Sequence, residues 1–197
     1  MVNQHSPDRA ERPADASSKP DGAGAAVKLE GATKPETPAK PETPLGVERL
    51  THLDVNEVCG LYKKVWEAQR GELPPEMIKA WVPAPLEFTS WMEGVNYFAA
   101  RRNGRLVGVI GLEISQGSGR IVHLAVDPDA RRQGVATALI RAAIEWARRS
   151  NCPSVWADAL SRFTAAADLL THLGFHDAGV LRRHQWNEDV RFFEQLL

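Results

Sequence analysis

A short basic turn that contains a glycine, Arg131-Arg132-Gln133-Gly134-Val135-Ala136, follows an apolar run from Ile121 to Val126 and opens an amphipathic helix. The first N–H groups of a helix have no partner within it, and the helix dipole adds roughly half a positive charge at that end. Gly134 has no Cβ that would keep the oxygens of a ligand away. The turn therefore predicts a phosphate-binding site at the start of this helix.

Strands that would position this turn are indicated by apolar runs and by turn signals. Asn103-Gly104, which lies between two such runs, is the strongest hairpin signal in the sequence. The predicted strands span residues 46–50, 96–102, 105–115, 120–126 and 154–159, and two closing strands fall within 175–193. Antiparallel strands therefore precede the basic turn, in a fold of the mixed α/β class.

Helices are predicted between these strands. Asp54 is a candidate N-cap of the first helix, and Glu57 completes a capping-box pattern with it. Ser161 is a candidate cap of the last helix, and Gly174 marks its end. The predicted helices span residues 54–69, 135–150 and 161–173, and short helices are expected in the Pro- and Trp-rich segment 71–94.

Length and composition indicate one folded domain behind a tail. The chain has 197 residues, of which 43% are hydrophobic, and this is enough for one core. Residues 1–44 contain no aromatic residue and no Ile, and the unit Lys-Pro-Glu-Thr-Pro occurs twice in succession. Such a segment buries too little apolar surface to offset the entropy lost on ordering. We expect residues 1–44 to be disordered and residues 45–197 to form the domain.

Charge, hydropathy and cysteine content argue against several classes of protein. The formal net charge of -1 does not favour a nucleic-acid binder. No apolar run approaches the roughly 18 residues of a membrane span, and the N-terminus lacks the apolar core of a signal peptide. Cys59 and Cys152 lack metal-ligand spacing, which favours free thiols in a reducing cytoplasm. We therefore expect a soluble cytoplasmic protein that binds no nucleic acid, membrane or metal.

The segment from Leu124 to Ala136 resembles motif A of the GNAT N-acetyltransferases, whose signature is Gln or Arg, any two residues, Gly, any residue, and then Gly or Ala. Arg131, Gly134 and Ala136 match this signature. The surroundings add to the match, because an apolar strand precedes the motif, a helix follows it, and Leu173-Gly174-Phe175 ends a later helix.

This resemblance extends from Gly46 to the end of the chain and implies the GNAT fold, a mixed, mostly antiparallel central sheet with splayed strands, flanked by helices. In this family the amides of the loop hold the pyrophosphate of acetyl-CoA, and the backbone of the preceding strand pairs with the pantetheine arm. The resemblance thus implies acetyl-CoA as cosubstrate. The implied cofactor-binding residues are Leu124, Ala125, Val126, Arg131, Arg132, Gln133, Gly134, Val135, Ala136 and Thr137.

Acetyl transfer to an amine needs a base, because an unperturbed Lys amine, with a pKa of about 10.4, is mostly protonated at neutral pH. Glu113 and Asp158 are the catalytic candidates, since the central strands should carry both carboxylates. Glu113 ranks first because its strand should neighbour the cofactor strand, whereas Asp158 falls where relatives often carry an acidic residue. His123 shares a strand face with Ala125, where a satisfied core histidine is favoured over a base.

Two positions depart from the family pattern. Many relatives carry Tyr five residues before the Phe of Leu-Gly-Phe and Asn twelve residues before it, and this chain has Leu170 and Phe163 there. No hydroxyl at position 170 can protonate the leaving thiolate.

Two hypotheses on function follow from the resemblance and its departures. The first is an acetyl-CoA-dependent N-acetyltransferase that acts by direct attack of a primary amine of a small molecule or protein. The second is a non-catalytic acyl-CoA-binding or sensor module of the same fold. A homodimer is left open.

Two segments are candidates for the acceptor side. Trp81, Phe88, Trp91 and Met92 form either an acceptor pocket or, in the interpretation that we favour, part of the core. Residues 184–189 carry polar groups that suit either acceptor binding or ordinary strand pairing.

Overall fold

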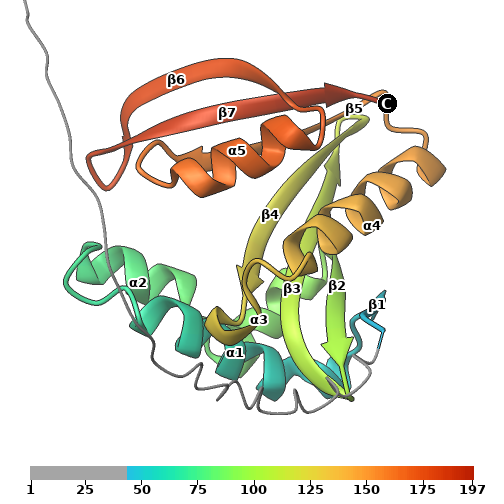
Figure 1. Cartoon of the computed structure of the whole chain (residues 1–197), viewed down its shortest axis with the longest axis vertical. Coiled ribbons are helices and arrows are strands. Elements are labelled where there is room, and N and C mark those ends of the chain that lie inside the picture. Colours follow the sequence, from blue (N-terminus) through green and yellow to red (C-terminus); the bar gives the residue numbers. More distant parts are fainter. Residues whose placement is uncertain (1–43) are drawn as a thin grey trace, which may run out of the picture. The chain divides into compact units, whose positions relative to one another are not determined.

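The computed structural model describes residues 44–197, so residues 1–43 of the predicted tail lie outside the described part (Figure 1). One seven-stranded sheet with the order β1-β2-β3-β4-β5-β7-β6 runs through the described residues. Its strands are β1 (Gly46–Arg49), β2 (Val95–Arg102), β3 (Arg105–Ser115), β4 (Ser118–Val126), β5 (Ser154–Leu160), β6 (His176–Gln185) and β7 (Glu188–Leu196). The strand pattern predicted from the sequence is confirmed.

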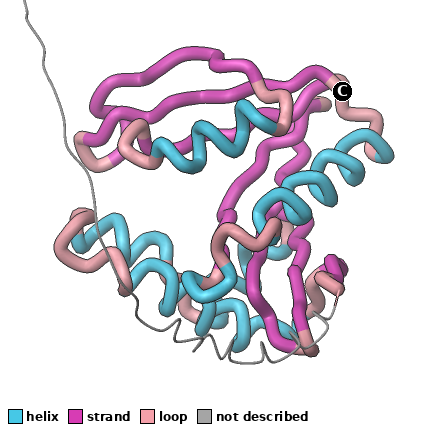
Figure 2. The backbone as a smooth tube through the Cα atoms, in the orientation of Figure 1, coloured by secondary structure: helices cyan, strands magenta, loops and turns pink. Residues whose placement is uncertain are grey.

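Helices cover both faces of this sheet (Figure 2). The helices α4 and α5 pack on one face, α1 and α3 pack on the other face over β2 to β4, and α2 packs beside them over β5 and β7. The α-helices are α1 (Val55–Glu67), α2 (Pro75–Trp81), α3 (Pro85–Met92), α4 (Val135–Arg149) and α5 (Thr164–His172), and two short 3-10 turns are η1 (His52–Asp54) and η2 (Pro128–Ala130).

The strands β4 and β5 separate in the middle of the sheet. They pair in parallel only from Gly119 to Ile121, against Val155 to Ala157, whereas every other neighbouring pair is antiparallel. Beyond these residues β4 continues toward α1 and β5 continues toward the β6–β7 hairpin (Figure 1). The mixed, mostly antiparallel sheet with splayed strands is therefore confirmed.

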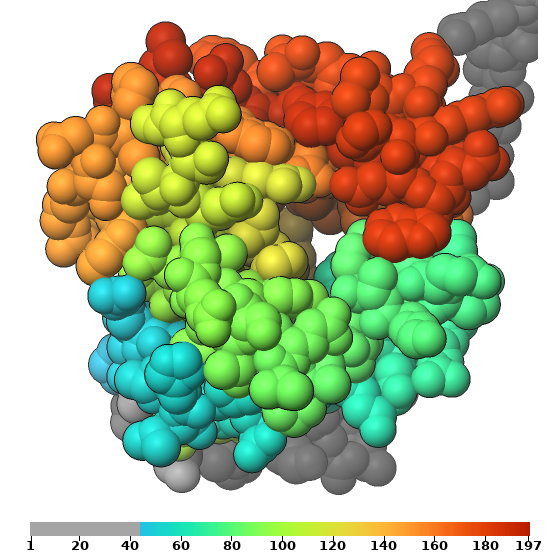
Figure 3. Space-filling model, turned by 180° about the vertical axis from the view of Figure 1, so that it is seen from behind, coloured from blue at the N-terminus to red at the C-terminus, as the bar shows by residue number. Residues whose placement is uncertain are grey.

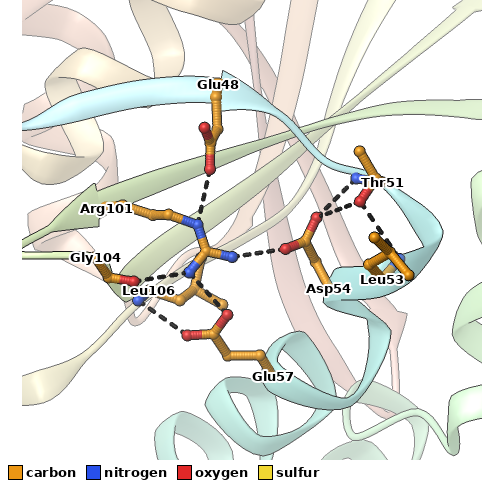
Figure 4. Close-up of polar contacts among 8 residues, drawn as sticks. All are labelled: Glu48, Thr51, Leu53, Asp54, Glu57, Arg101, Gly104 and Leu106. Carbon is orange, nitrogen blue, oxygen red and sulfur yellow. Dashed lines mark hydrogen bonds and ion pairs between the residues drawn. The ribbon is translucent and has the colours of Figure 1, made fainter.

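The start of α1 departs from the predicted capping pattern (Figure 4). Asp54 does precede the helix, but its carboxylate accepts hydrogen bonds from the backbone N–H and the hydroxyl of Thr51, at 2.9 and 2.8 Å, one turn earlier. Arg101 of β2 draws both predicted capping carboxylates to itself, with its nitrogens 2.7 Å from Asp54 and 2.8 Å from Glu57. The predicted capping box is wrong because a cation from a distant strand competes for both side chains.

Arg101 ties the first strand, the first helix and β2 together. Its guanidinium also lies 2.8 Å from Glu48 of β1, and only 19% of its side chain is exposed. Burial raises the pKa of Asp54, but the hydrogen bonds from Thr51 and the charge of Arg101 lower this pKa, and the net result lies below its ordinary value. Removal of Arg101 leaves three carboxylates close together without their shared cation.

We predict that Arg101→Gln lowers the free energy of unfolding by about 2 kcal/mol, because partly buried carboxylates lose a hydrogen-bonded cation. Chemical denaturation followed by circular dichroism measures this change. Arg148→Gln is the matched control, since Arg148 forms only an exposed ion pair with Glu145 and its loss should cost less than roughly 0.5 kcal/mol. Equal effects of the two substitutions would contradict the assignment.

Candidate functional site

The basic turn leads from β4 into α4 with a left-handed glycine at the helix start. Gly134 is the N-cap residue, with φ of 79° and ψ of 0°, and Arg132 also has a positive φ of 61°. The helix begins at Val135, so its first N–H groups face the exposed turn without intrahelical partners. The structure thus presents the geometry of an anion site where the sequence predicts one.

A buried carboxylate fixes the position of this turn. Asp127, only 2% exposed, accepts hydrogen bonds from Lys64 of α1 and Arg105 of β3, each at 2.6 Å, and from the backbone N–H of Asp129 at 3.0 Å. Burial raises the pKa of Asp127, but these hydrogen bonds and the two cations outweigh it and lower the pKa below its ordinary value. Asp127 therefore joins the loop to two other elements.

Arg102 adds a cation beside the turn that sequence reasoning missed. Its guanidinium, at the end of β2, donates to the side-chain oxygen of Gln133, whose amide nitrogen donates in turn to the carbonyl of Asp129 at 3.0 Å. Arg131 and Arg132 are exposed on the same turn. Because Arg102 is distant in sequence, only the folded sheet brings it to the predicted phosphate site.

A bulge interrupts β4 where it leaves β5. Val122 pairs with Gly111 and Ala125 pairs with Val109, so His123 and Leu124 together face a single residue of β3. His123 has a φ of 57°, which lies in the left-handed region that a side chain rarely adopts. The bulge re-aims the backbone of the predicted cofactor strand at the place where the sheet opens.

Beyond the bulge the faces of β4 follow the predicted alternation. Leu124 and Val126 pack against the core beneath α4, whereas Ala125 packs against the core beneath α1 and α3. His123 lies on the same side as Ala125, because its ring contacts Trp91 of α3. Among the implied cofactor residues in α4, Val135 is buried, and Ala136 and Thr137 are half-buried.

His123 is engaged by aromatic neighbours. Its imidazole stacks on Trp91 with the ring centres 4.4 Å apart, its Nδ1 lies 2.5 Å from the hydroxyl of Tyr97, and its carbonyl accepts a hydrogen bond from Tyr62 at 2.7 Å. His123 is exposed by its accessible surface, yet Trp91 and Tyr97 crowd its ring and take part of it out of water. This desolvation, aided by the charge of Arg120, lowers the pKa of His123 to about 4. His123 is therefore neutral at pH 7.

The two carboxylates predicted as catalytic lie on the same face of the sheet. Glu113 of β3 stands directly opposite Arg120 of β4, and Arg120 lies beside Trp156 of β5 in the parallel pairing. The guanidinium of Arg120 stacks 4.7 Å above the Trp156 ring and lies 3.0 Å from Asp158. Glu113, Arg120 and Asp158 thus cross three neighbouring strands beside the opening.

Arg120 and Trp156 are site residues that sequence reasoning missed. Both sit in strands whose pattern indicated only half-buried sheet positions, and no local motif marks them. The pairing of β4 with β5 brings them together. A charged residue near the start of a central strand was the one available signal, since such a residue needs a partner.

The side chains in and just before α5 are apolar at the two positions that depart from the family pattern, Leu170 and Phe163. Leu170 is 6% exposed and belongs to the core beneath α4. Phe163 stacks on Trp66 of α1 with the ring centres 6.5 Å apart. The helix begins at Thr164 with Phe163 as its N-cap residue, so the predicted cap at Ser161 is wrong. The backbone N–H of Ser161 bonds to the carbonyl of Asp189 at 2.8 Å, and its hydroxyl makes no capping hydrogen bond.

The aromatic acceptor candidates separate into two groups. Phe88 is fully buried, and Trp91 packs with it at 6.0 Å, so both belong to the core beneath α1 and α3. Trp81 instead lines an open surface pocket, called the cavity below, of about 400 Å³ together with His184, Gln185 and Trp186. Figure 3 shows an opening in the molecule between β4 in yellow, α2 in green and the β6–β7 hairpin in red.

Within residues 44–197, no helix is long and apolar enough to cross a membrane. The same residues contain no cluster of three or more His, Cys, Asp or Glu side chains arranged to hold a metal ion.

Sequence comparison identifies relatives of this chain. The sequence model of the Acetyltransferase (GNAT) family matches residues 56–175. The curated ribosomal protein bS18-alanine N-acetyltransferase of Escherichia coli strain K12 is 27% identical over 94 residues, which is 48% of this chain and 64% of the relative. The chain thus matches less than two thirds of the length of this curated relative.

Solved structures with the same fold include three N-acetyltransferases. The ribosomal-protein-alanine N-acetyltransferase of Brucella melitensis has a TM-score of 0.65 at 20% identity, covering 77% of this chain and 99% of that one. The ribosomal-protein-S18-alanine N-acetyltransferase of Escherichia coli has a TM-score of 0.64 at 20% identity, and the match covers 78% of this chain and 94% of that one. An N-acetyltransferase of Thermoplasma acidophilum in complex with coenzyme A has a TM-score of 0.66 at 13% identity, and the match covers 79% of this chain and 100% of that one. At these identities the likeness establishes the fold.

We predict that stability falls in acid through Asp127. Because its pKa in the folded protein lies below the ordinary value of 3.8, its contribution is fully present above that value and is lost as pH falls through the lower, folded-state pKa. Asp127→Asn should cost on the order of 2 kcal/mol at pH 7 and flatten the stability curve at low pH. Urea denaturation across this pH range measures both effects. If the free energy of unfolding of the variant fell in acid as steeply as that of the wild type, the prediction would be refuted.

We predict that Gly134→Val weakens binding of acetyl-CoA at least about tenfold, because a β-branched residue resists the left-handed backbone and fills space in the turn. Isothermal titration calorimetry measures the affinity, and thermal unfolding checks the fold. Gly71→Val is the control, since Gly71 also has a positive φ, of 92°, and a Cβ there meets open space. Unchanged affinity in Gly134→Val would place the diphosphate elsewhere.

Proposed function

Because this chain belongs to the acetyltransferase (GNAT) family, we propose that it is an acetyl-CoA-dependent N-acetyltransferase that acts on a primary amine by direct attack. The observation that carries the proposal is the course of β4, which leaves β5 after Ile121, bulges at His123 and leads into the turn at Gly134. An extended thioester with a diphosphate at one end matches this course. The activity named for the bS18-alanine relative supports a primary amine as acceptor.

The diphosphate would lie at the turn. The N–H groups of the first turn of α4 and the cations of Arg102, Arg131 and Arg132 would neutralise its charge. The strand backbone at residues 124–126 would pair with the pantetheine arm, and a strand N–H there would polarise the thioester carbonyl. The reacting carbon would then lie where β4 and β5 separate.

Asp158 is the base that we propose for the amine. Deprotonation of an ordinary amine at pH 7 costs on the order of 4 to 5 kcal/mol, so a positioned base accelerates the reaction. Asp158 directly follows Ala157, the last residue of β5 that pairs with β4. Glu113, which ranks first from the sequence, takes second place here because it stands on β3, one strand farther from the separation. His123 is a weaker candidate, because its Nδ1 already faces the hydroxyl of Tyr97 and its ring stacks on Trp91.

The thiolate would leave without an acid from α5. Leu170 carries no hydroxyl, and a thiol of ordinary acidity leaves as the thiolate far more readily than an alkoxide would. The proposed order of events is therefore capture of the neutral amine beside Asp158, attack on the carbonyl held by the strand N–H, and departure of coenzyme A.

A non-catalytic acyl-CoA-binding module is the alternative, and the apolar side chains of Leu170 and Phe163 favour it. Purified protein incubated with acetyl-CoA and a panel of primary amines separates the two. Release of free coenzyme A together with acetylated amine supports the enzyme, whereas tight binding of acetyl-CoA without turnover on any amine supports the module. Absence of acetyl-CoA binding would overturn both.

We predict that Asp158→Asn lowers kcat/KM about 100-fold or more, because the amide cannot accept the proton of the amine. The affinity for acetyl-CoA should stay within about twofold of the wild type, because Asp158 lies away from the diphosphate site. Glu113→Gln is the matched comparison on the neighbouring strand, with a smaller expected loss. Steady-state kinetics measure both variants, and a large loss in Glu113→Gln beside a small loss in Asp158→Asn would reverse the assignment.

A further inference from the structure

We propose that the acceptor is a small primary amine with one aromatic group, whose ring lies in the cavity at Trp81 and Trp186 while its amine reaches Asp158. This inference rests on the proposed function and adds the chemical class of the substrate. Three features of the acceptor side carry it: an aromatic wall between the cavity and Asp158, carboxylates of the β6–β7 hairpin that are already paired with arginines, and an opening that packed elements bound on opposite sides.

The cavity is formed by two indoles from distant parts of the chain. Trp81 ends α2, and Trp186 lies in the turn between β6 and β7, where it and Asn187 both have positive φ values of 46° and 65°. The two rings meet edge to face with their centres 6.1 Å apart. Trp186 remains 43% exposed, so part of its surface is available to a ligand. Aromatic rings favour such edge and offset contacts with a further ring.

An aromatic wall continues from this cavity to the proposed base. His184 lines the cavity and packs against Phe192 at 6.0 Å, and Phe192 packs against Trp156 at 6.1 Å. Phe192 stands directly opposite Asp158 in the antiparallel pairing of β5 with β7, so their side chains share one face of the sheet. The wall therefore leads from the cavity toward the carboxylate, in the direction that a molecule with a ring at one end and an amine at the other would follow.

Carboxylates of the β6–β7 hairpin beside the cavity already have basic partners. Glu188 lies 3.3 Å from Arg162, and Asp189 lies 3.7 Å from Arg182 while it also accepts a hydrogen bond from the backbone N–H of Arg183 at 2.9 Å. These pairs leave little excess negative charge to hold a second cation there. An uncharged ring suits this end of the site better than a second ammonium group does.

The opening is bounded on opposite sides, which favours a small molecule. A core formed by Leu73, Met77, Ile78, Leu160 and Val190 joins α2 to β5 and β7. Arg162 adds a hydrogen bond of 2.8 Å to the carbonyl of Glu72. The opening in Figure 3 is thus enclosed by packed elements rather than open along one side.

The experiment compares matched amines on the full chain with saturating acetyl-CoA. We expect 2-phenylethylamine to exceed n-propylamine and 1,4-diaminobutane in kcat/KM by about tenfold or more, chiefly through a lower KM, because the ring gains contact with two indoles. A peptide that begins with Ala serves as the fourth acceptor. Preference for the diamine or the peptide over 2-phenylethylamine would overturn the proposal.

Variants at the cavity test the location of the ring. Trp186→Ala should raise the KM for 2-phenylethylamine about tenfold and change the KM for n-propylamine less than about twofold, with kcat nearly unchanged for both. Trp81→Ala should act in the same direction. Trp146→Ala is the control, because Trp146 lies on α4 on the other face of the sheet and packs with Phe98. Equal losses on both amines, or no loss on either, would refute the cavity as the site of the ring.

The outcomes separate this inference from the proposed function. If no amine is acetylated although acetyl-CoA binds, the proposed function fails. If amines are acetylated without preference for the aromatic one, the function stands and the inference fails.

Discussion

The early end of pairing between β4 and β5 is the constraint on which the site depends. After Ile121 and Ala157 the two strands no longer satisfy each other's backbone groups, and buried N–H and C=O groups need partners. Tyr62 meets one such need by donating to the carbonyl of His123. Further along β4, the edge that faces away from β3 can accept an extended ligand in the way that a sheet edge accepts a strand.

The separation also divides the molecule chemically into two ends. The α4 end gathers Arg102, Arg131 and Arg132 around a helix start and suits a polyanion. The α2 end gathers aromatic rings near the ion pair of Arg120 with Asp158 and suits an amine with an apolar body. Two substrates of different charge would therefore enter from different sides and meet between the strands.

Features with a local sequence signal were predicted, whereas features made by tertiary contacts were not. The start of α4 after Gly134, the Asn103-Gly104 hairpin and the stop at Gly174 follow from short-range chemistry, and the structure has all three, whereas the left-handed backbone of Gly134 was not predicted. The bulge at His123 has no such signal. Whether two residues of one strand face a single residue of its partner depends on the pairing of the strands and is not visible in the sequence of either strand alone.

The site residues that were missed have the same origin. Arg120 and Trp156 become neighbours only when β4 pairs with β5, and Arg102 reaches the turn only through the order of strands in the sheet. Asp54 is the N-cap residue of α1 as predicted, but the capping box with Glu57 is absent for the converse reason: the local pattern was present, whereas the Asp54 carboxylate binds Thr51 and Arg101 instead.

The single carboxylate of Asp127 has a consequence for communication across the molecule. One of its oxygens binds Lys64 on α1, the helix that also carries Tyr62 and Trp66 on the acceptor side, while the loop it anchors leads to the start of α4. Because one carboxylate contacts α1 and also fixes the loop before α4, a displacement of α1 would strain the start of α4, and a displacement of that loop would strain α1 in turn.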